Sequence, residues 1–205
     1  MEKRKFLVLG HPRSGTTFSA KLLRDFGYQV GHEAMKDDGI SSWMFAVEDN
    51  QVFTSLGLNR KDYTFEYIIM NIRNPVDIIT STYFTENTSK KSMNYRKKYV
   101  NFEGLNKVEE AVKSVLEWYK LIEMQRPHLK LFIDKNPEEK LFHFLKRFDN
   151  KEGLLPIKKI KKKINARKHP DLSLSFIKEN CGEELFSELI HFCGLYDYHV
   201  FANPK

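Results

Sequence analysis

Apolar residues follow two patterns along this chain, and each pattern predicts its own kind of element. Short runs of consecutive apolar residues are typical of strands buried on both faces of a parallel sheet. Longer stretches in which apolar residues return every three or four positions are typical of helices that bury one face. We expect strands at about residues 6–9, 28–31, 67–72 and 129–133. We expect helices at about residues 15–27, 76–86, 105–125 and 138–148, and two more between residues 172 and 193.

The order of these elements predicts an α/β protein. Strands alternate with helices, which is the pattern of βαβ units and leads to a parallel sheet. We expect three layers, with a central parallel sheet of four to five strands and helices on both faces. The length of 205 residues suits one such domain with a sizeable core, so we expect a single domain over residues 1–205.

Four segments have no clear apolar period and are interpreted from their turn residues and composition. Asp37-Asp38-Gly39 predicts a turn with a helix start, because apolar residues follow at helical spacing through Val47. Residues 50–66 predict a helix-and-loop crossover, and residues 87–104 predict a mobile loop. Residues 149–170 contain Gly, Pro and a basic run, which indicates a loop or lid before a helical C-terminal segment at 171–205.

The first apolar run leads directly into a turn that contains glycine, and then into the first expected helix. Residues 10–17 read Gly-His-Pro-Arg-Ser-Gly-Thr-Thr. A strand, such a turn and a helix aim backbone N–H groups and the positive end of the helix at an anion. The spacing resembles the Walker A pattern of P-loop proteins, but Thr16 stands where that pattern has a lysine. We therefore expect a phosphate cradle that does not serve an ATPase.

This loop and a later segment resemble the two nucleotide-binding motifs of sulfotransferases that use 3′-phosphoadenylyl sulfate (PAPS). The family's second motif follows a later strand and consists of an Arg and a Ser about eight positions apart. Here Arg73 follows the apolar run 67–72, and Ser81 stands eight positions later. The resemblance covers roughly residues 5–145. It implies a three-layer P-loop NTPase-like fold and a small sulfotransferase of the bacterial or carbohydrate type.

The resemblance also implies which residues bind PAPS. The 5′-phosphosulfate would lie on the loop residues Pro12, Arg13, Ser14, Gly15, Thr16 and Thr17. Arg73 and Ser81 would bind the 3′-phosphate that distinguishes PAPS from ATP. Sulfuryl transfer needs positive charge and hydrogen-bond donors at the leaving oxygen. Arg13 would supply the charge, and the loop amides and hydroxyls would supply the donors, without a metal ion.

The catalytic base remains open between two neighbouring residues, Glu33 and His32. Both follow the expected strand 28–31, and ligands of open α/β sheets bind beyond the carboxyl ends of the strands. In the family that the chain resembles, carbohydrate-type and some bacterial members use a Glu soon after the first loop. Burial would raise the pKa of Glu33 toward the range that a base needs. His32 has an ordinary pKa already near neutrality. The alternative is that one of the two caps the turn toward Asp37.

The net charge of +7 comes from one segment. Seven basic residues and no acidic one lie between Lys158 and Lys168; without these seven, 27 basic residues balance 27 acidic ones. This is not the generally basic surface that binds nucleic acid. The segment is a solvated face, a contact for an anionic acceptor, or a lid over the nucleotide. For the lid, the resemblance implies Arg167 and Lys168 as the contacts.

Composition indicates a reducing, cytoplasmic setting. No apolar stretch approaches the ~20 residues of a membrane span, and no signal-peptide core follows the first residues. The two cysteines, Cys181 and Cys193, are too few for a disulfide framework and wrongly spaced for a zinc site. We expect a small molecule or a carbohydrate as the sulfate acceptor, with residues 87–104 beside it.

Two other functions remain open. A nucleotide or small-molecule kinase of the P-loop fold would need a metal ion and a phosphate-binding lysine, and Thr16 argues against it. A catalytically inactive nucleotide-binding module would bind the bisphosphate product without turning over any acceptor.

Overall fold

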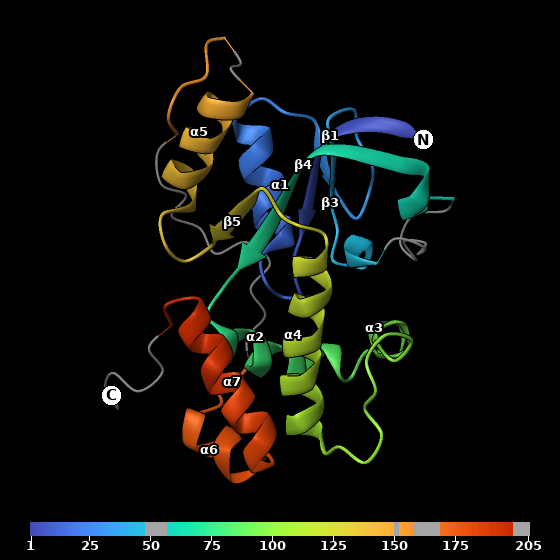
Figure 1. Ribbon diagram of the computed structural model, residues 1–205, viewed down its shortest axis with the longest axis vertical. Coiled ribbons are helices and arrows are strands. Elements are labelled where there is room, and N and C mark those ends of the chain that lie inside the picture. Colours follow the sequence, from blue (N-terminus) through green and yellow to red (C-terminus); the bar gives the residue numbers. More distant parts are fainter. Residues whose placement is uncertain (48–56, 150–151, 158–168, 199–205) are drawn as a thin grey trace. The chain divides into compact units, whose positions relative to one another are not determined.

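The computed structural model describes residues 1–47, 57–149, 152–157 and 169–198 (Figure 1). The chain divides into two compact units. The first unit comprises residues 1–72 and 121–166, and the second comprises residues 73–120 and 167–205. The expectation of a single domain over residues 1–205 stays a prediction.

A five-stranded sheet forms the centre of the first unit. All of its strands are parallel, in the order β2-β3-β1-β4-β5. The strands are β1 (Glu2–Leu9), β2 (Val30–His32), β3 (Gly39–Ser41), β4 (Tyr63–Ile72) and β5 (Leu129–Phe132). The predicted α/β fold with a parallel sheet of four to five strands is therefore confirmed.

The direction of the chain across the sheet reverses between β1 and β4. From β1 the chain passes through α1 (Thr16–Asp25) to β2 on one side, whereas β4 connects to β5 on the other side. Leu9 of β1 is in register with Met70 of β4, so both strands end at the same edge. Open α/β sheets bind their ligands beyond the carboxyl ends of the strands at such a reversal. The loop after β1 begins at this point.

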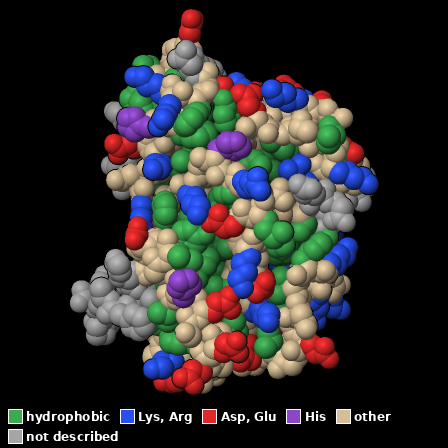
Figure 2. Space-filling view, viewed as in Figure 1, with side chains coloured by type: hydrophobic (Ala, Val, Ile, Leu, Met, Phe, Trp, Pro, Cys, Tyr) green, Lys and Arg blue, Asp and Glu red, His purple; other side chains and the backbone are tan. Residues whose placement is uncertain are grey.

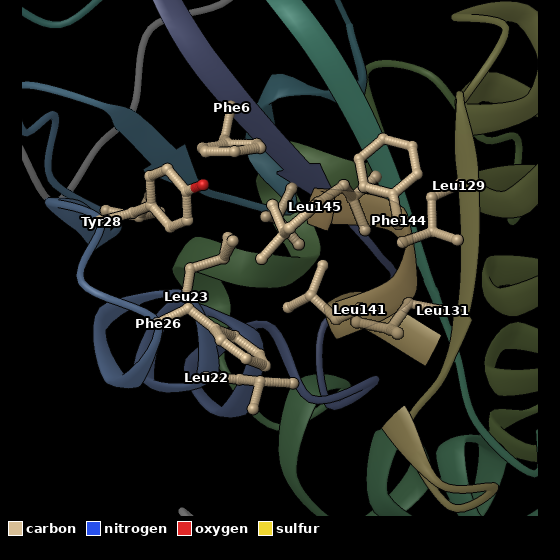
Figure 3. Packing of buried hydrophobic residues seen from close by; sticks show 13 residues of the cluster. Phe6, Leu22, Leu23, Phe26, Tyr28, Leu129, Leu131, Leu141, Phe144 and Leu145 are labelled. Atoms are coloured by element: carbon tan, nitrogen blue, oxygen red, sulfur yellow. The ribbon is translucent and has the colours of Figure 1, made fainter. Parts of the chain in front are cut away.

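Two helices, α1 and α5 (Pro137–Phe148), cover one face of the sheet (Figure 3). Their apolar side chains pack against those of the strands because burial removes apolar surface from water. The buried cluster consists of Phe6, Val8, Leu22, Leu23, Phe26, Tyr28, Val30, Ile69, Leu129, Leu131, Leu141, Phe144 and Leu145. Helices are expected on both faces of the sheet. They are shown on this face, and for the other face they stay a prediction.

The end of α1 fixes where β2 begins. Gly27 has a positive φ of 82°, which glycine adopts without the strain that a side chain brings. The N–H of Gly27 donates to the carbonyl of Arg24, and the N–H of Tyr28 donates to that of Leu23. This pair of bonds is a Schellman motif, and it ends the helix near the predicted bound at residue 27.

The segment after Asp38 corrects one prediction. Instead of a helix start, residues 39–41 form β3, which inserts between β2 and β1. A Cβ on Gly39 would lie 1.9 Å from the carbonyl oxygen of Phe6, so only glycine lets the two backbones approach. The residues that suggested helical spacing belong to this strand and to a single 3-10 turn, Met44–Ala46. A strand of three residues is too short to show a period of two.

The chain before β4 corrects a second prediction. Residues 63–66, expected in a crossover, already belong to the strand, and a 3-10 turn at Arg60–Asp62 precedes it. The exposed and half-buried side chains alternate in this part of β4, which hid it beside the continuous apolar run that follows. Residues 48–56 of the expected crossover lie outside the described residues.

The second unit is helical. It contains α2 (Pro75–Ser81) followed by a π-helical turn (Thr82–Glu86), α3 (Lys90–Arg96), α6 (Leu174–Glu179) and α7 (Glu183–Leu195). The long helix α4 (Lys107–Met124) begins in this unit. Tyr119 of α4 packs on Phe192 of α7 with ring centroids 5.2 Å apart, and Lys120 forms an ion pair of 2.5 Å with Glu188. The two predicted C-terminal helices are confirmed.

Two expected loops have different outcomes. Residues 87–104 contain the helix α3, so the prediction of a loop throughout was wrong. The helix buries the side chains of Met93, Tyr95 and Arg96. In the predicted lid 149–170, residues 152–157 and 169–170 have no regular structure, while 158–168 lie outside the described residues. On the face shown in Figure 2, basic and acidic side chains are interspersed. None of the described helices is long and apolar enough to cross a membrane.

Candidate functional site

The loop between β1 and α1 has the backbone of an anion cradle. Arg13 and Gly15 both have positive φ, at 76° and 96°, and the N–H of Ser14 donates to the carbonyl of His11 at 2.9 Å. The helix begins at Thr16, and no side chain of the described residues caps it. Uncapped N–H groups at the positive end of a helix dipole attract an anion. Residues 12–17, which the sequence singled out, all lie in this loop or in the first turn of α1.

The loop folds tightly over the end of β1. A Cβ on Gly10 would lie 2.1 Å from Ser14 Oγ and 3.1 Å from Asn71 Cβ, so a larger residue there would displace the Ser14 hydroxyl. Ser14 is fully buried, and its hydroxyl makes no hydrogen bond with the described residues. Asn71, also fully buried in β4, accepts a hydrogen bond of 2.9 Å from Ser19 of α1. These contacts hold the loop against β1 and β4, where the chain direction reverses.

His32, the last residue of β2, reaches the start of α1. Its Nε2 lies 3.2 Å from Thr16 Oγ1 and 3.1 Å from Thr17 Oγ1. Burial lowers the pKa of His32 from its ordinary value of 6.5, and the positive charge of Arg24 lowers it further. The imidazole is therefore neutral at neutral pH. One neutral ring nitrogen accepts hydrogen bonds, so either threonine hydroxyl can donate to Nε2.

Glu33 follows His32 with a positive φ of 53° and a carboxylate that is almost fully buried. Its Oε2 accepts a hydrogen bond of 2.5 Å from the Ser42 hydroxyl, and the Trp43 backbone N–H also donates to the carboxylate. Its Oε1 lies 3.8 Å from His32 Nε2. Burial raises the pKa of Glu33 from 4.5 to about 7, although both hydrogen bonds oppose the rise. A carboxylate with this pKa can exchange a proton near neutrality.

The residues of the second expected motif lie in the other unit. Arg73 follows β4 directly in the chain and forms an ion pair of 3.1 Å with Asp77, one turn into α2. Asn74 accepts the N–H of Val76 and so caps α2, with Pro75 at its first position. Ser81 is buried. Their approach to the loop at residues 12–17 stays a prediction.

Arg167 and Lys168, the expected lid residues, lie outside the described residues. Among the residues that the structure describes, no three His, Cys, Asp or Glu side chains come together as a group that could hold a metal ion.

Sequence reasoning missed Ser41 and Ser42, which both support the site. The hydroxyl of Ser41 donates to the Thr16 carbonyl at 2.8 Å, and that of Ser42 donates to Glu33. Both serines are fully buried. Their position at the carboxyl end of a strand would have revealed them if β3 had been recognised.

No family model, no curated protein and no solved structure matches the chain. The function must therefore be inferred from the chemistry of the residues around the loop.

Proposed function

We propose that the protein is a PAPS-dependent sulfotransferase. It would move the sulfuryl group from PAPS to a hydroxyl or amine of a small molecule or carbohydrate, and release adenosine 3′,5′-bisphosphate. One observation carries the proposal: the Glu33 carboxylate, whose pKa is raised by burial, lies next to the loop of residues 12–17. Glu33 Oε1 is 3.8 Å from His32 Nε2, which in turn is 3.1 Å from the Thr17 hydroxyl.

The loop supports binding of the 5′-phosphosulfate. Backbone N–H groups and the hydroxyls of Thr16 and Thr17 would donate to its oxygens, and Arg13 would add a positive charge. Thr16 stands where a nucleoside triphosphatase has a lysine for the terminal phosphates. PAPS carries a sulfuryl group in place of those phosphates, so its binding needs less positive charge at this position.

The reaction would balance as a single displacement. The acceptor oxygen or nitrogen forms a bond to sulfur while its proton passes to Glu33. The bond between sulfur and the bridging oxygen breaks, and the electron pair remains on the phosphate of adenosine 3′,5′-bisphosphate. Arg13 and the hydroxyls of Thr16 and Thr17 stabilise the negative charge that develops on that oxygen. Arg is permanently charged, so Arg13 acts electrostatically and donates no proton.

Arg73 and Ser81 would bind the 3′-phosphate. An arginine makes two parallel hydrogen bonds to a phosphate, which suits it to a group that distinguishes PAPS from ATP. Arg73 now pairs with the exposed Asp77, and exposed ion pairs contribute little, about 0–1 kcal/mol. Exchanging this partner for a phosphate would cost little free energy.

Calorimetric binding without metal tests the proposal. We expect the wild-type protein to bind adenosine 3′,5′-bisphosphate at micromolar affinity and ADP weakly. Arg73→Ala should lose most of the bisphosphate affinity and none of the weak ADP affinity. Arg147→Ala, which removes an exposed arginine from α5, should bind like the wild type.

Two results would overturn the proposal. Equal binding of the two nucleotides, or binding that requires Mg²⁺, would favour the kinase. Selective binding of the bisphosphate, with no turnover of PAPS on a panel of phenol, amine and sugar acceptors, would favour the inactive nucleotide-binding module.

A further inference from the structure

We propose that Ser42 is the positioning residue that orients Glu33 and holds its carboxylate ready to accept a proton. This inference rests on the proposed function for the role of Glu33, but the contact itself is independent of that role. Ser42 Oγ lies 2.5 Å from Glu33 Oε2, and Ser42 is fully buried.

The sheet itself brings the two residues together. His32 of β2 is in register with Ser41 of β3, so the residues that follow them, Glu33 and Ser42, leave the same edge side by side. The N–H of Glu33 donates to the Ser41 carbonyl at 3.1 Å, and the N–H of Ser42 donates to the carbonyl of Val8 in β1 at 2.9 Å. Backbone hydrogen bonds therefore fix both residues to neighbouring strands, independently of the contact between their side chains.

The Ser42 hydroxyl has a second hydrogen-bond partner besides Glu33. The N–H of Met44 donates to Ser42 Oγ at 3.2 Å. The ionised carboxylate of Glu33 can only accept, so the hydroxyl accepts from Met44 and donates its own proton to Glu33. The Trp43 N–H is a second donor to the same carboxylate. Two donors favour the ionised form of a carboxylate, which is the form that can act as a base.

The hydrogen bonds from Ser42 and Trp43 oppose the effect of burial on the pKa of Glu33. Burial raises the pKa of Glu33, and the bonds from Ser42 and Trp43 lower it again, so that the group titrates at about 7. The neighbouring titratable group is His32, 3.8 Å from Oε1, and Arg24 acts in turn on His32. With Oε2 held by Ser42, Oε1 is the oxygen that faces His32 on the side of the threonine hydroxyls.

Selective ¹³C labelling of Glu side chains tests this directly, with the Glu33 signal assigned by its loss in Glu33→Gln. In Ser42→Ala we expect the pKa of Glu33 to rise by about one unit. The lost hydrogen bond stabilises the ionised carboxylate by an amount that corresponds to about one pKa unit. Ser41→Ala is the matched control, since that neighbouring hydroxyl donates to the Thr16 carbonyl instead. It should leave the pKa of Glu33 unchanged.

A second variant protects the test against misfolding. Ser42→Cys keeps nearly the same size but replaces the hydroxyl with a weak donor, so it should also raise the pKa of Glu33. A pKa that is unchanged or lowered in the folded Ser42 variants would overturn the role of Ser42, whatever the protein catalyses. If Glu33 is the base, the pH at which PAPS turnover rises on the acidic side of its pH–rate profile should move up with the pKa of Glu33. A raised pKa without this shift would show that Glu33 is not the base.

Discussion

The imidazole of His32 lies within hydrogen-bond distance of the Thr17 hydroxyl, with Nε2 and Oγ1 3.1 Å apart. The two residues belong to different elements, since His32 ends β2 and Thr17 is in the first turn of α1. The Glu33 carboxylate approaches the same ring nitrogen, with Oε1 3.8 Å from Nε2. One nitrogen of His32 therefore lies near both the carboxylate and the hydroxyls that begin the helix. Substitution of His32 separates the roles of the two titratable groups.

The first prediction distinguishes the two candidate bases by the pH dependence of PAPS turnover. If Glu33 is the base, activity rises as the pH passes through about 7, because the carboxylate must lose its proton first. If His32 is the base, the rise comes below the ordinary histidine pKa of 6.5, because burial lowers the pKa of His32. Glu33→Gln should reduce kcat by about 10²–10⁴-fold.

His32→Gln is the matched comparison for that experiment. It removes the imidazole but keeps a polar side chain, so under the Glu33 mechanism the acid limb should stay near 7. A limb that disappears with His32 and persists with Glu33→Gln would assign the base to His32 instead.

The fold could be predicted from the sequence wherever its apolar pattern was long. Phe6–Leu9 and the run from Tyr67 to Ile72 identified the two central strands, and the helical repeat of α4 gave bounds within two residues of the structure. The missed strand β3 depends on a backbone contact between Gly39 and Phe6. A contact between segments more than thirty residues apart leaves no periodic signal in either one.

The site divides in the same way. Glu33 and His32 could be placed beside the loop because parallel strands end at a common edge. Ser42 could not, since its role depends on the register between β2 and β3. The buried pairing of Arg96 was hidden for another reason, because residues 87–104 are polar and show no period around it.

The second prediction concerns the close contact at Gly39. Gly39→Ala places a Cβ 1.9 Å from the Phe6 carbonyl oxygen at a residue with a φ of 140°. We expect a loss of about 3 kcal/mol or more in the free energy of unfolding, because both the clash and the backbone strain must be relieved. Urea unfolding followed by circular dichroism measures this.

Gly194→Ala provides the control within the same chain. Gly194 lies in α7, its φ is not positive, and a Cβ there meets no atom within 4 Å. This substitution should stabilise the protein by roughly 0.5–1 kcal/mol through helix propensity. A Gly39→Ala protein as stable as the wild type would contradict the pairing of β3 with β1.

The third prediction concerns the buried guanidinium of Arg96 in α3. Its two terminal nitrogens donate to Ser114 Oγ at 2.7 Å and to Asn87 Oδ1 at 3.1 Å, and burial lowers its pKa to about 10. Ser114→Ala removes one of these acceptors from a buried charge. We expect a loss of about 1.5–3 kcal/mol in the free energy of unfolding.

Ser92→Ala is the matched control for Ser114→Ala. Ser92 is also buried in this unit, but its hydroxyl has no hydrogen-bond partner among the described residues. Its removal should leave stability unchanged or slightly raised, because an unsatisfied hydroxyl is no longer buried. Equal losses in the two variants would show that Arg96 gains nothing specific from Ser114.

The fourth prediction is that Glu33 destabilises the folded protein at alkaline pH. The folded-state pKa, about 7, lies above the ordinary value of 4.5, so the folded protein holds this proton more tightly than the unfolded chain. Ionisation therefore costs nothing below roughly pH 4.5 and its full amount above about pH 7. A rise of this size corresponds to at most about 3 kcal/mol.

In Glu33→Gln, the amide oxygen can still accept from Ser42 and Trp43 while no charge is buried. We expect the variant and the wild type to unfold alike at about pH 4, and the variant to be more stable by roughly 1–3 kcal/mol at about pH 8. Urea unfolding at both pH values measures the difference. A variant that is less stable than the wild type at about pH 8 would show that the ionised carboxylate is stabilised in the fold, and that the pKa of Glu33 is not raised.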